Sequence, residues 1–568
     1  MASTDPGAPA PILPPALTAA DDAPAPRASL SRAAGGVSLA VLASRVLGLV
    51  REVVFASLFG ASRELDAFIA AFRIPNLLRD LFAEGALSAA FVSTFTQKLE
   101  REGAKPAWEL ANRVLNDLLF VVGTVVVVGM IAAPWIVDWI APGFRAEPGK
   151  IELTITLTRI LFPFLLLVAL AAVAMGVLNA RSIFLVPAFA SSFFNLGSIV
   201  GGLAFVAWLA PDYLPAVWSR ITGGPRVEAD DTVQALVGMA FGTLVGGAFQ
   251  LFVQVPSLRG VGFRYQPIAG FRDPGVRQVL RLMGPATIGI SAVQINVMVN
   301  TYFASGLGNG AVSWLNVAFR LMYLPIGMFG VALGTVALPA MARAAARSDV
   351  AAFRASAGEG LRLLTVLCLP SAVGLAILAD PIIAIIYQHG RFHASDTHEA
   401  AIALAGYAVG LTGYAAIKIL GPAFYALDDA RTPMRVSLLS VAINLAGNWL
   451  AVSVLGLGHG GLALSTSTVA LWNSALLYFL LRRKVGGRGF GILSATWRVG
   501  GATLAMGIAC AAWLALLHHP APTFVRSLVS VATTVPLGIL VFYGAGRALG
   551  VNDLERATAL LRRRLLGR

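Results

Sequence analysis

Positively charged side chains interrupt several segments that are otherwise apolar. They are Arg45, Arg51, Arg73, Arg79, Arg159, Arg320 and Lys418. A charge in the middle of a bilayer costs at least about 2.5–3.5 kcal/mol on insertion scales, so these groups are not expected to face lipid. The planar guanidinium of arginine donates two parallel hydrogen bonds to a phosphate group. The pattern therefore predicts a water-filled chamber that binds an anionic substrate.

Acidic residues in the same segments offer a second interpretation. Glu52, Asp66, Asp80 and Glu84 lie close in sequence to the first four of these arginines. The acids could neutralise the arginines and hold the helices together, or they could act as gating and ion-pair groups beside a substrate. The anionic substrate is favoured because Arg159, Arg320 and Lys418 have few or no acids in their own segments.

The composition indicates a membrane protein. Of the 568 residues, 57% are hydrophobic and 13% are charged, whereas a soluble domain has about 45–50% apolar and about 25% charged residues. This balance excludes a soluble enzyme, a disordered protein and a fibrous protein. The net charge of +14 is spread among the segments between apolar stretches, which is typical of membrane topology and not of nucleic-acid binding.

Apolar stretches long enough to cross a bilayer recur along the chain, and we expect an all-α, polytopic protein with about fourteen transmembrane helices. The expected spans are 36–60, 66–97, 114–140, 154–179, 186–210, 233–256, 282–305, 312–339, 362–387, 400–425, 436–456, 460–481, 498–518 and 525–547. If the N-terminus is inside, the inner segments hold 27 Lys and Arg and the outer ones hold 7. The positive-inside rule then predicts that both termini are cytoplasmic.

An internal repeat divides these spans into two halves. The segment 55–60 (FASLFG) matches 303–308 (FASGLG), and 71–73 (AFR) matches 318–320 at nearly the same offset. Two six-helix lobes related by a pseudo-two-fold axis, followed by two further helices, account for this pattern. The expected divisions are a Pro- and Ala-rich disordered tail (1–30), an N-terminal lobe (31–258), a C-terminal lobe (259–484), two helices (485–548) and a basic amphipathic tail (549–568).

The first two spans resemble a known family. The segments SRVLG (44–48), AFRIPNLLR (71–79) and FAEGA (82–86), together with Arg51, Glu52 and Asp66, are similar to the N-terminal signature of the MurJ/MviN family of lipid II flippases. The resemblance covers roughly residues 35–545. It departs from the family at Asp80, where some relatives have a basic residue, and at Phe319 and Tyr323, where relatives often have acids.

The resemblance implies that the protein moves undecaprenyl-pyrophosphate disaccharide-pentapeptide (lipid II) from the inner to the outer leaflet of the bacterial inner membrane. It implies transport without enzymatic catalysis, by a monomer, with lipid II and the bilayer as partners and cell-wall synthesis proteins as further candidates. It implies that the substrate-binding residues are Arg45, Arg51, Arg73, Arg79 and Arg320, to which Lys418 is added, and that the last two spans hold the lipid tail. An exporter of another polyprenyl-pyrophosphate-linked oligosaccharide remains the alternative, because its anionic group is the same.

Other candidate sites are less specific. Some relatives have a sodium site, and Asn444 and Asn448 with Ser465 or Thr468 supply oxygen atoms for one, although no carboxylate accompanies them. Polar packing between helices is the other interpretation. His389, His393, Asp396, His398 and Glu399 resemble a metal cluster but are expected to form an outer loop without ordered ligand geometry. No cofactor is expected, and the membrane potential is the expected driving force.

Overall fold

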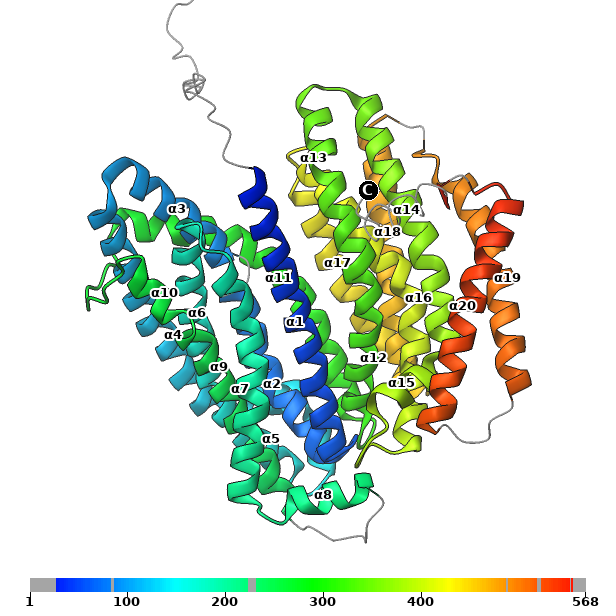
Figure 1. The fold of residues 1–568 in the computed structure, drawn as a ribbon, viewed down its shortest axis with the longest axis horizontal. Helices are drawn as coiled ribbons and strands as arrows, with labels where there is room; N and C mark the ends of the chain where they lie inside the picture. Colours follow the sequence, from blue (N-terminus) through cyan, green and yellow to red (C-terminus); the bar gives the residue numbers. More distant parts are fainter. Residues whose placement is uncertain are drawn as a thin grey trace, which may run out of the picture.

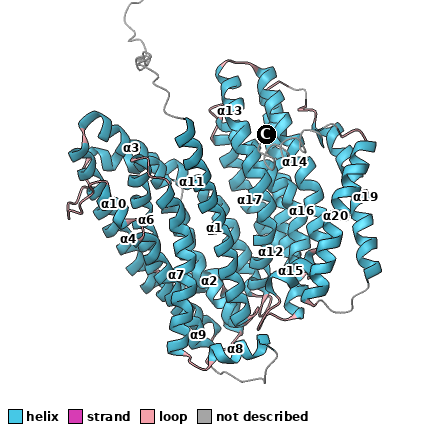
Figure 2. Ribbon diagram, in the orientation of Figure 1, coloured by secondary structure: helices cyan, strands magenta, loops and turns pink. Residues whose placement is uncertain are grey.

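The computed structural model describes residues 27–82, 86–222, 231–486, 489–517, 523–551 and 553–554. All regular structure in these ranges is helical (Figure 2). The expected all-α fold is therefore confirmed. The reason is that an apolar chain in lipid must satisfy its backbone hydrogen bonds within its own segment.

The N-terminal lobe begins with the helices that carry most of the predicted site. Its helices are α1 (Arg27–Phe59), α2 (Arg63–Phe82), α3 (Ala86–Glu102), α4 (Ala104–Ile140), the 3-10 turn η1 (Pro142–Ala146), α5 (Lys150–Leu161), α6 (Pro163–Ala180), α7 (Leu185–Leu209), α8 (Tyr213–Thr222), α9 (Thr232–Phe252) and α10 (Val255–Gly260). The expected span over 66–97 falls on α2 and α3, and residues 83–85 between them lie outside the described residues.

The C-terminal lobe and the two final helices complete the chain. The lobe comprises α11 (Pro274–Ser305), α12 (Ala311–Pro325), the π-helical turn η2 (Ile326–Val331), α13 (Ala332–Ala346), α14 (Val350–Ile377), α15 (Ala379–Tyr387), α16 (Ala394–Tyr425), α17 (Arg431–Trp449), the π-helical turn η3 (Leu450–Val454) and α18 (Gly458–Lys484). The final helices are α19 (Ile492–Leu517) and α20 (Phe524–Ala548), and they pack against α14 and α15.

The two lobes stand side by side and lean apart toward the end at which α1 begins (Figure 1). The described part of α20 finishes at this same end. The lobes meet at the opposite end, where α8 lies across the molecule. We call this the closed end, and its contacts involve residues 57–66, 142–150, 213, 305–313 and 390–396.

Helix α11 contacts both lobes. It packs against α3 and α4 of the N-terminal lobe and against α17 of the C-terminal lobe. Figure 1 shows it between the two groups of helices. Because α11 touches both sides of the interlobe space, it forms part of the wall of any chamber between them.

Small residues bring helices of the N-terminal lobe close together. A Cβ atom on Gly242 of α9 would lie 2.2 Å from Cα of Gly202 on α7, so neither position has room for a side chain. Ser198 and Gly246 extend the same contact along the two helices. Close backbone approach of this kind is typical of helices packed within a membrane, where van der Waals contact replaces the hydrophobic effect.

Eleven described helices are long and apolar enough to cross a membrane. They correspond to eleven of the fourteen expected spans, and the count of fourteen is therefore not established by length and composition. The three other expected spans fall on α1, α2 with α3, and α11. Helices α1 and α2 carry Arg45, Arg51, Glu52, Arg73 and Arg79, and these charges lower the mean hydropathy of both helices.

Candidate functional site

A cavity of about 700 Å³ lies between the two lobes, and helices of both lobes line it. The arginines that line it are Arg45, Arg51, Arg73, Arg79 and Arg320. Glu52 is the one acidic side chain among the described residues that line this space. Five guanidinium groups with one carboxylate give the cavity a strong positive potential, and its low-dielectric walls increase that potential further.

Helical periodicity explains why these arginines face one space. Arg45 and Glu52 are seven residues apart and therefore share a face of α1. Arg73, Asn76 and Arg79 follow one another at intervals of three residues along α2, and all three line the cavity. Arg320 faces them from α12, and it is the counterpart of Arg73 in the internal repeat.

The arginines have different surroundings. Arg320 forms an ion pair with Glu52 that joins α12 to α1 across the boundary between the lobes. The guanidinium carbon of Arg51 lies 4.9 Å from the ring centroid of Phe194 on α7. The Nε atom of Arg73 is buried and has no hydrogen-bond acceptor. An unpaired buried donor is costly, and an anion that enters the cavity would supply the missing acceptor.

The structure separates two other predicted cations from this group. Arg159 lies exposed on the surface of α5, and its Nε atom donates to the backbone oxygen of Met130 at 3.2 Å. Lys418 is half-buried on α16 and is absent from the residues that line the cavity. The structure therefore brings neither Arg159 nor Lys418 into the lining of this cavity.

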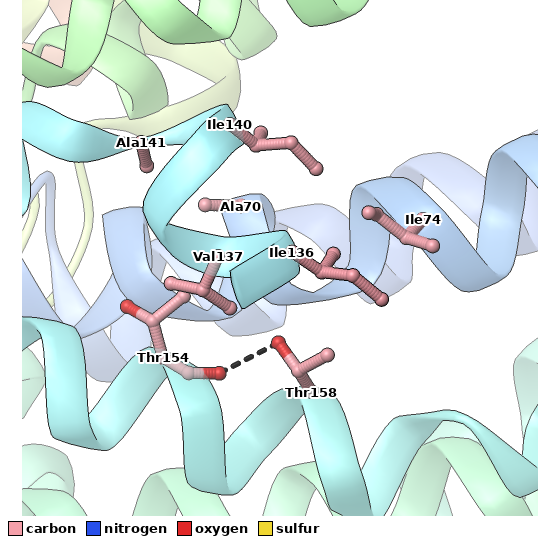
Figure 3. A pocket seen from close by; sticks show the side chains of 8 residues that line it. All are labelled: Ala70, Ile74, Ile136, Val137, Ile140, Ala141, Thr154 and Thr158. Carbon is pink, nitrogen blue, oxygen red and sulfur yellow. Dashed lines mark hydrogen bonds between the residues drawn. The ribbon is translucent and has the colours of Figure 1, made fainter. Parts of the chain in front are cut away.

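A second, much smaller cavity of about 10 Å³ lies inside the N-terminal lobe (Figure 3). Its walls are mainly apolar and come from α2, α4 and α5. Its two polar side chains are Thr154 and Thr158, and the Thr158 hydroxyl donates to the backbone oxygen of Thr154 at 2.7 Å. This space has room for at most a single water molecule and no charged group, so it is a packing gap and not a substrate site.

Of the two predicted acids whose side chains are described, Glu52 lines the cavity and Asp66 does not. Asp66 is fully buried at the closed end. Asp80 lies on α2, but its side chain is outside the described residues, and so is the whole of Glu84. Because Asp66 is engaged at the closed end, it does not neutralise the cavity arginines.

Asp66 is the centre of a buried polar cluster that joins the lobes. From the C-terminal lobe it accepts hydrogen bonds from the backbone nitrogens of Gly310 (2.8 Å) and Ser313 (2.9 Å) and from the Ser313 hydroxyl (2.7 Å). Lys150 of the N-terminal lobe lies 3.1 Å from Asp66 and donates to Asn309 at 2.8 Å. The side chain of Lys150 is 1% exposed, so this is a fully desolvated ion pair.

A second contact at the closed end is made by the segment between α15 and α16. The backbone nitrogen of Arg391 donates to the backbone oxygen of Ser57 at 2.9 Å. Its guanidinium donates to the hydroxyls of Tyr213 (3.1 Å) and Thr232 (2.9 Å) in the N-terminal lobe. Gly390 has a φ of +61°, and a Cβ atom there would lie 2.3 Å from the Ser57 oxygen. The two backbones therefore meet where only glycine fits.

Sequence reasoning missed both Lys150 and Arg391. It placed them among the seven basic residues of the outer segments, and no local pattern distinguishes them from the other five. Their partners lie far away in the chain, 84 positions for Lys150 with Asp66 and 178 positions for Arg391 with Tyr213. The internal repeat was the one available signal, because Asp66 and Ser313 are separated by 247 positions, the same offset as Arg73 and Arg320.

Comparison with known proteins finds relatives that match most of the chain. Residues 55–533 match the family model described as "Lipid II flippase MurJ". The chain is 38% identical over 460 residues to the lipid II flippase MurJ of Burkholderia cenocepacia, covering 80% of this chain and 84% of that protein. The chain belongs to the lipid II flippase MurJ family.

Other members and solved structures extend this relationship. The probable lipid II flippase MurJ of Rhizobium meliloti is 33% identical over 538 residues, which is 92% of this chain and 95% of that protein. A structure titled "Lipid II flippase MurJ, inward closed conformation" has a TM-score of 0.71 at 24% identity, and it covers 93% of this chain and 99% of that one. An inward-facing multidrug transporter of the MATE family has a TM-score of 0.65 at 15% identity, covering 78% and 94%. These two structures share the fold with this MurJ family member.

The predicted cation residues of this MurJ family member lie in a polar cluster of the C-terminal lobe. Asn448 donates to the amide oxygens of Asn300 (2.7 Å) and Asn444 (3.4 Å), and Asn300 donates to the Thr466 hydroxyl (3.0 Å). Thr468 is exposed and bonds to its own helix, so Thr466 takes the place that the sequence gave to Thr468. Asn444 Nδ2, Asn448 Oδ1 and the predicted Ser465 Oγ are buried without a hydrogen-bond partner. No carboxylate is among the described residues of this cluster, so the donor set is a poor match for a hard cation.

The histidine-rich segment makes no metal site among the described residues. The Nε2 atom of His389 lies 3.1 Å from the backbone oxygen of Ile385. His398 lies 3.4 Å from Asp380 and is mostly exposed. These side chains bond separately and do not converge on one point.

Proposed function

We propose that this protein is a lipid II flippase that carries undecaprenyl-pyrophosphate disaccharide-pentapeptide from the inner to the outer leaflet. The observation that carries the proposal is the interlobe cavity with five arginines and one acid, in a chain that belongs to the lipid II flippase MurJ family. A drug exporter for cations would instead need an excess of acids in this space. Phosphate recognition by several guanidinium groups is the chemistry that this lining supports best.

The arginines supply both charge and hydrogen-bond donors to the pyrophosphate. Arg73 offers a buried Nε atom that has no hydrogen-bond acceptor within the described part of the protein. Arg320 is held by Glu52 across the lobe boundary. When an anion enters, it competes with Glu52 for Arg320, and it therefore changes the contacts between the lobes. Substrate binding and lobe movement are coupled through this shared arginine.

Transport then requires the two lobes to move so that the cavity closes at one end and opens at the other. The contacts around Asp66 and Arg391 hold the closed end together, and their rupture opens the cavity on that side. We assign the other end, where α1 begins, to the cytoplasm, because the segments at that end carry most of the Lys and Arg. The closed end then faces the outer leaflet, and the protein is an inner-membrane transporter with both termini cytoplasmic.

The membrane potential supports this cycle with the correct sign. An inside-negative potential drives the anionic substrate outward and draws the empty, positively charged cavity back. No chemical step is needed, so the chain is a transporter without catalytic residues. We assign no step to sodium, because the asparagine cluster lacks a carboxylate. A monomer contains both lobes and is the expected transport unit, and cell-wall synthesis proteins remain candidate partners.

The test is complementation of a bacterium depleted of its own flippase, with lipid II accessibility measured at the outer leaflet. We expect the wild type to restore growth and Arg45→Ala or Arg320→Ala to lose function at normal membrane abundance. Lysine at either position should restore function partly, because bidentate geometry is lost. Arg159→Ala is the matched control, since Arg159 lies outside the cavity.

Three results would contradict the proposal. The first is full function of the arginine-to-alanine variants. The second is that the arginine-to-alanine variants, and the control Arg159→Ala as well, disappear from the membrane. That result would assign the arginines a role in folding. The third is transport of another polyprenyl-pyrophosphate-linked saccharide but not of lipid II, which would support the alternative substrate.

A further inference from the structure

Aromatic side chains form part of the cavity wall beside the arginines. Tyr323 of α12 lines the cavity and is 41% exposed. Phe319, one helical turn earlier, also lines the cavity, and the two ring centroids are 5.8 Å apart. A tyrosine ring adds no positive charge to this chamber, so it is not needed to bind an anion. We therefore look for an uncharged part of the substrate that it could contact.

The ring of Phe319 is fixed by two tyrosines behind it. Its centroid lies 5.5 Å from that of Tyr407 at an interplanar angle of 74°, and 6.4 Å from that of Tyr414 at 83°. Both tyrosines lie on α16, which packs directly against α12. Edge-to-face contacts of this kind hold an aromatic ring in one orientation. The aromatic part of the wall is therefore a preorganised surface.

The position of Tyr323 relative to the arginines follows from two contacts between α1 and the C-terminal lobe. Glu52 pairs with Arg320, and seven residues earlier on α1 the guanidinium of Arg45 lies against Gly327, seven residues after Arg320. A Cβ atom on Gly327 would be 2.9 Å from Nη1 of Arg45. The two segments therefore run antiparallel with matched spacing, and Tyr323 lies between the levels of the two arginines.

The distances along α12 match a ligand that has a ring next to a phosphate. Arg320 and Tyr323 are one turn apart, which is about 5 Å along the helix axis. In a polyprenyl-pyrophosphate saccharide, the first sugar is joined to the second phosphate through a single oxygen atom. If Arg320 binds the second phosphate, the adjoining sugar ring reaches the level of Tyr323, one turn further along the same wall.

We propose that Tyr323, supported by Phe319, is the platform on which the first sugar ring of the substrate packs. The apolar C–H face of a pyranose is attracted to an aromatic ring by burial and by the negative face of the π-system. Asn76 and Asn316 also line the cavity and offer amide donors and acceptors for the sugar hydroxyls. This inference rests on the proposed function, since it requires the arginines to hold the pyrophosphate.

The test compares two lipids that differ only in the saccharide. The probes are undecaprenyl pyrophosphate and lipid II, and their affinities for the purified full-length protein are measured by native mass spectrometry. We expect Tyr323→Leu to weaken lipid II binding about tenfold, in line with the loss of one aromatic contact. The same variant should leave the affinity for undecaprenyl pyrophosphate within about twofold of the wild type. Tyr323→Phe keeps the ring and should bind both lipids nearly as the wild type does.

Controls separate this inference from the proposed function. Tyr425→Leu removes an exposed tyrosine outside the cavity and should change neither affinity. Arg45→Ala should weaken both lipids. If Tyr323→Leu weakens both lipids equally or neither, the sugar platform is refuted while the proposed function stands. If Arg45→Ala weakens neither, or the wild type binds neither lipid, the proposed function fails and the platform fails with it. Thermal unfolding of each variant identifies any loss of fold.

Discussion

Replacing Ser313 with alanine is expected to shift the protein toward the state in which the closed end is open. The Ser313 hydroxyl donates at 2.7 Å to Asp66, a buried carboxylate in the other lobe. It is one of three hydrogen bonds that Asp66 accepts from the C-terminal lobe, and the other two come from backbone nitrogens of Gly310 and Ser313 that the substitution keeps. The substitution therefore removes one contact that exists only when the lobes meet.

The size of the effect follows from the charge on the acceptor. A hydrogen bond to a charged group contributes about 1.5–3 kcal/mol. Because each 1.4 kcal/mol is a factor of about ten in an equilibrium constant, the ratio of shut to open molecules should fall roughly 10- to 150-fold. In the open state the hydroxyl of Ser313 is hydrated, so its loss costs little there. Ser313→Ala should therefore change the equilibrium between the two states without a comparable change in the stability of either lobe.

The assay is a distance measurement between spin labels on the two lobes. Cysteines at positions 146 and 395 place the labels on exposed residues of η1 and of the start of α16, both at the closed end. The two native cysteines, Cys368 and Cys510, are buried, so they compete poorly for the label. Ser313→Ala should increase the population with long distances, and addition of substrate to the wild type should do the same if transport proceeds through this state.

Ser198→Ala is the matched control. Ser198 is fully buried in the N-terminal lobe, and its hydroxyl has no hydrogen-bond partner. The substitution changes the same atoms but removes no contact between the lobes, so the distance distribution should stay as in the wild type. An unchanged distribution for Ser313→Ala, or a shift toward shorter distances, would refute the role given to the Asp66 cluster.

Three further predictions concern the closed end, the surface and the driving force. Gly390→Ala should also populate the open state, because its Cβ atom would lie 2.3 Å from the Ser57 oxygen. Gly308 has a positive φ but open space around it, so Gly308→Ala controls for backbone strain. Equal spin-label distances in the two variants would contradict the prediction. Asp429 lies in the segment between α16 and α17, and a hydrogen bond from Lys484 at the end of α18 lowers its pKa from 3.8 to about 2. A folded-state pKa below the unfolded one means that this contact stabilises the protein above about pH 3.8 and is lost as the pH falls toward 2. The difference in melting temperature between the wild type and Asp429→Asn should therefore shrink over this range, and a constant difference would disprove the assignment. Finally, an anion with about two charges gains roughly 4–5 kcal/mol per 100 mV, so depolarised vesicles should flip lipid II more slowly even with ion gradients intact, and an unchanged rate would exclude the potential as a driving force.

Two charged residues, Arg320 and Asp66, each have partners that the transport cycle would change. Arg320 pairs with Glu52 in this conformation, and the proposed substrate would compete for the same guanidinium group. At the closed end, Lys150 and Asp66 belong to the same lobe, so we expect their ion pair to persist when the C-terminal lobe moves away. The buried carboxylate therefore keeps a counter-charge in both states, which lowers the barrier to separation.

The amino-acid sequence by itself determined the helical character of the chain and the identity of the cavity arginines. Apolar segments of bilayer length admit no other regular structure than helices that satisfy their own backbone groups. Arg45, Arg51, Arg73 and Arg79 could be assigned to an interior because charge in an apolar segment has a high cost in lipid. Periodicity also placed Arg45 and Glu52 on one face, since that relation depends only on positions within one helix.

The tertiary structure alone decided which of these groups meet. Arg159 satisfies the same composition rule as Arg320, yet it lies exposed on α5, and Lys418 is not among the residues that line the cavity. The pairing of Lys150 with Asp66, and of Asp66 with Ser313 at a separation of 247 positions, depends on how helices of two lobes are aligned. Helical periodicity describes only the face of a single helix. The relative height and rotation of two helices are set by the packing of many side chains at once, and this is information that no local pattern contains.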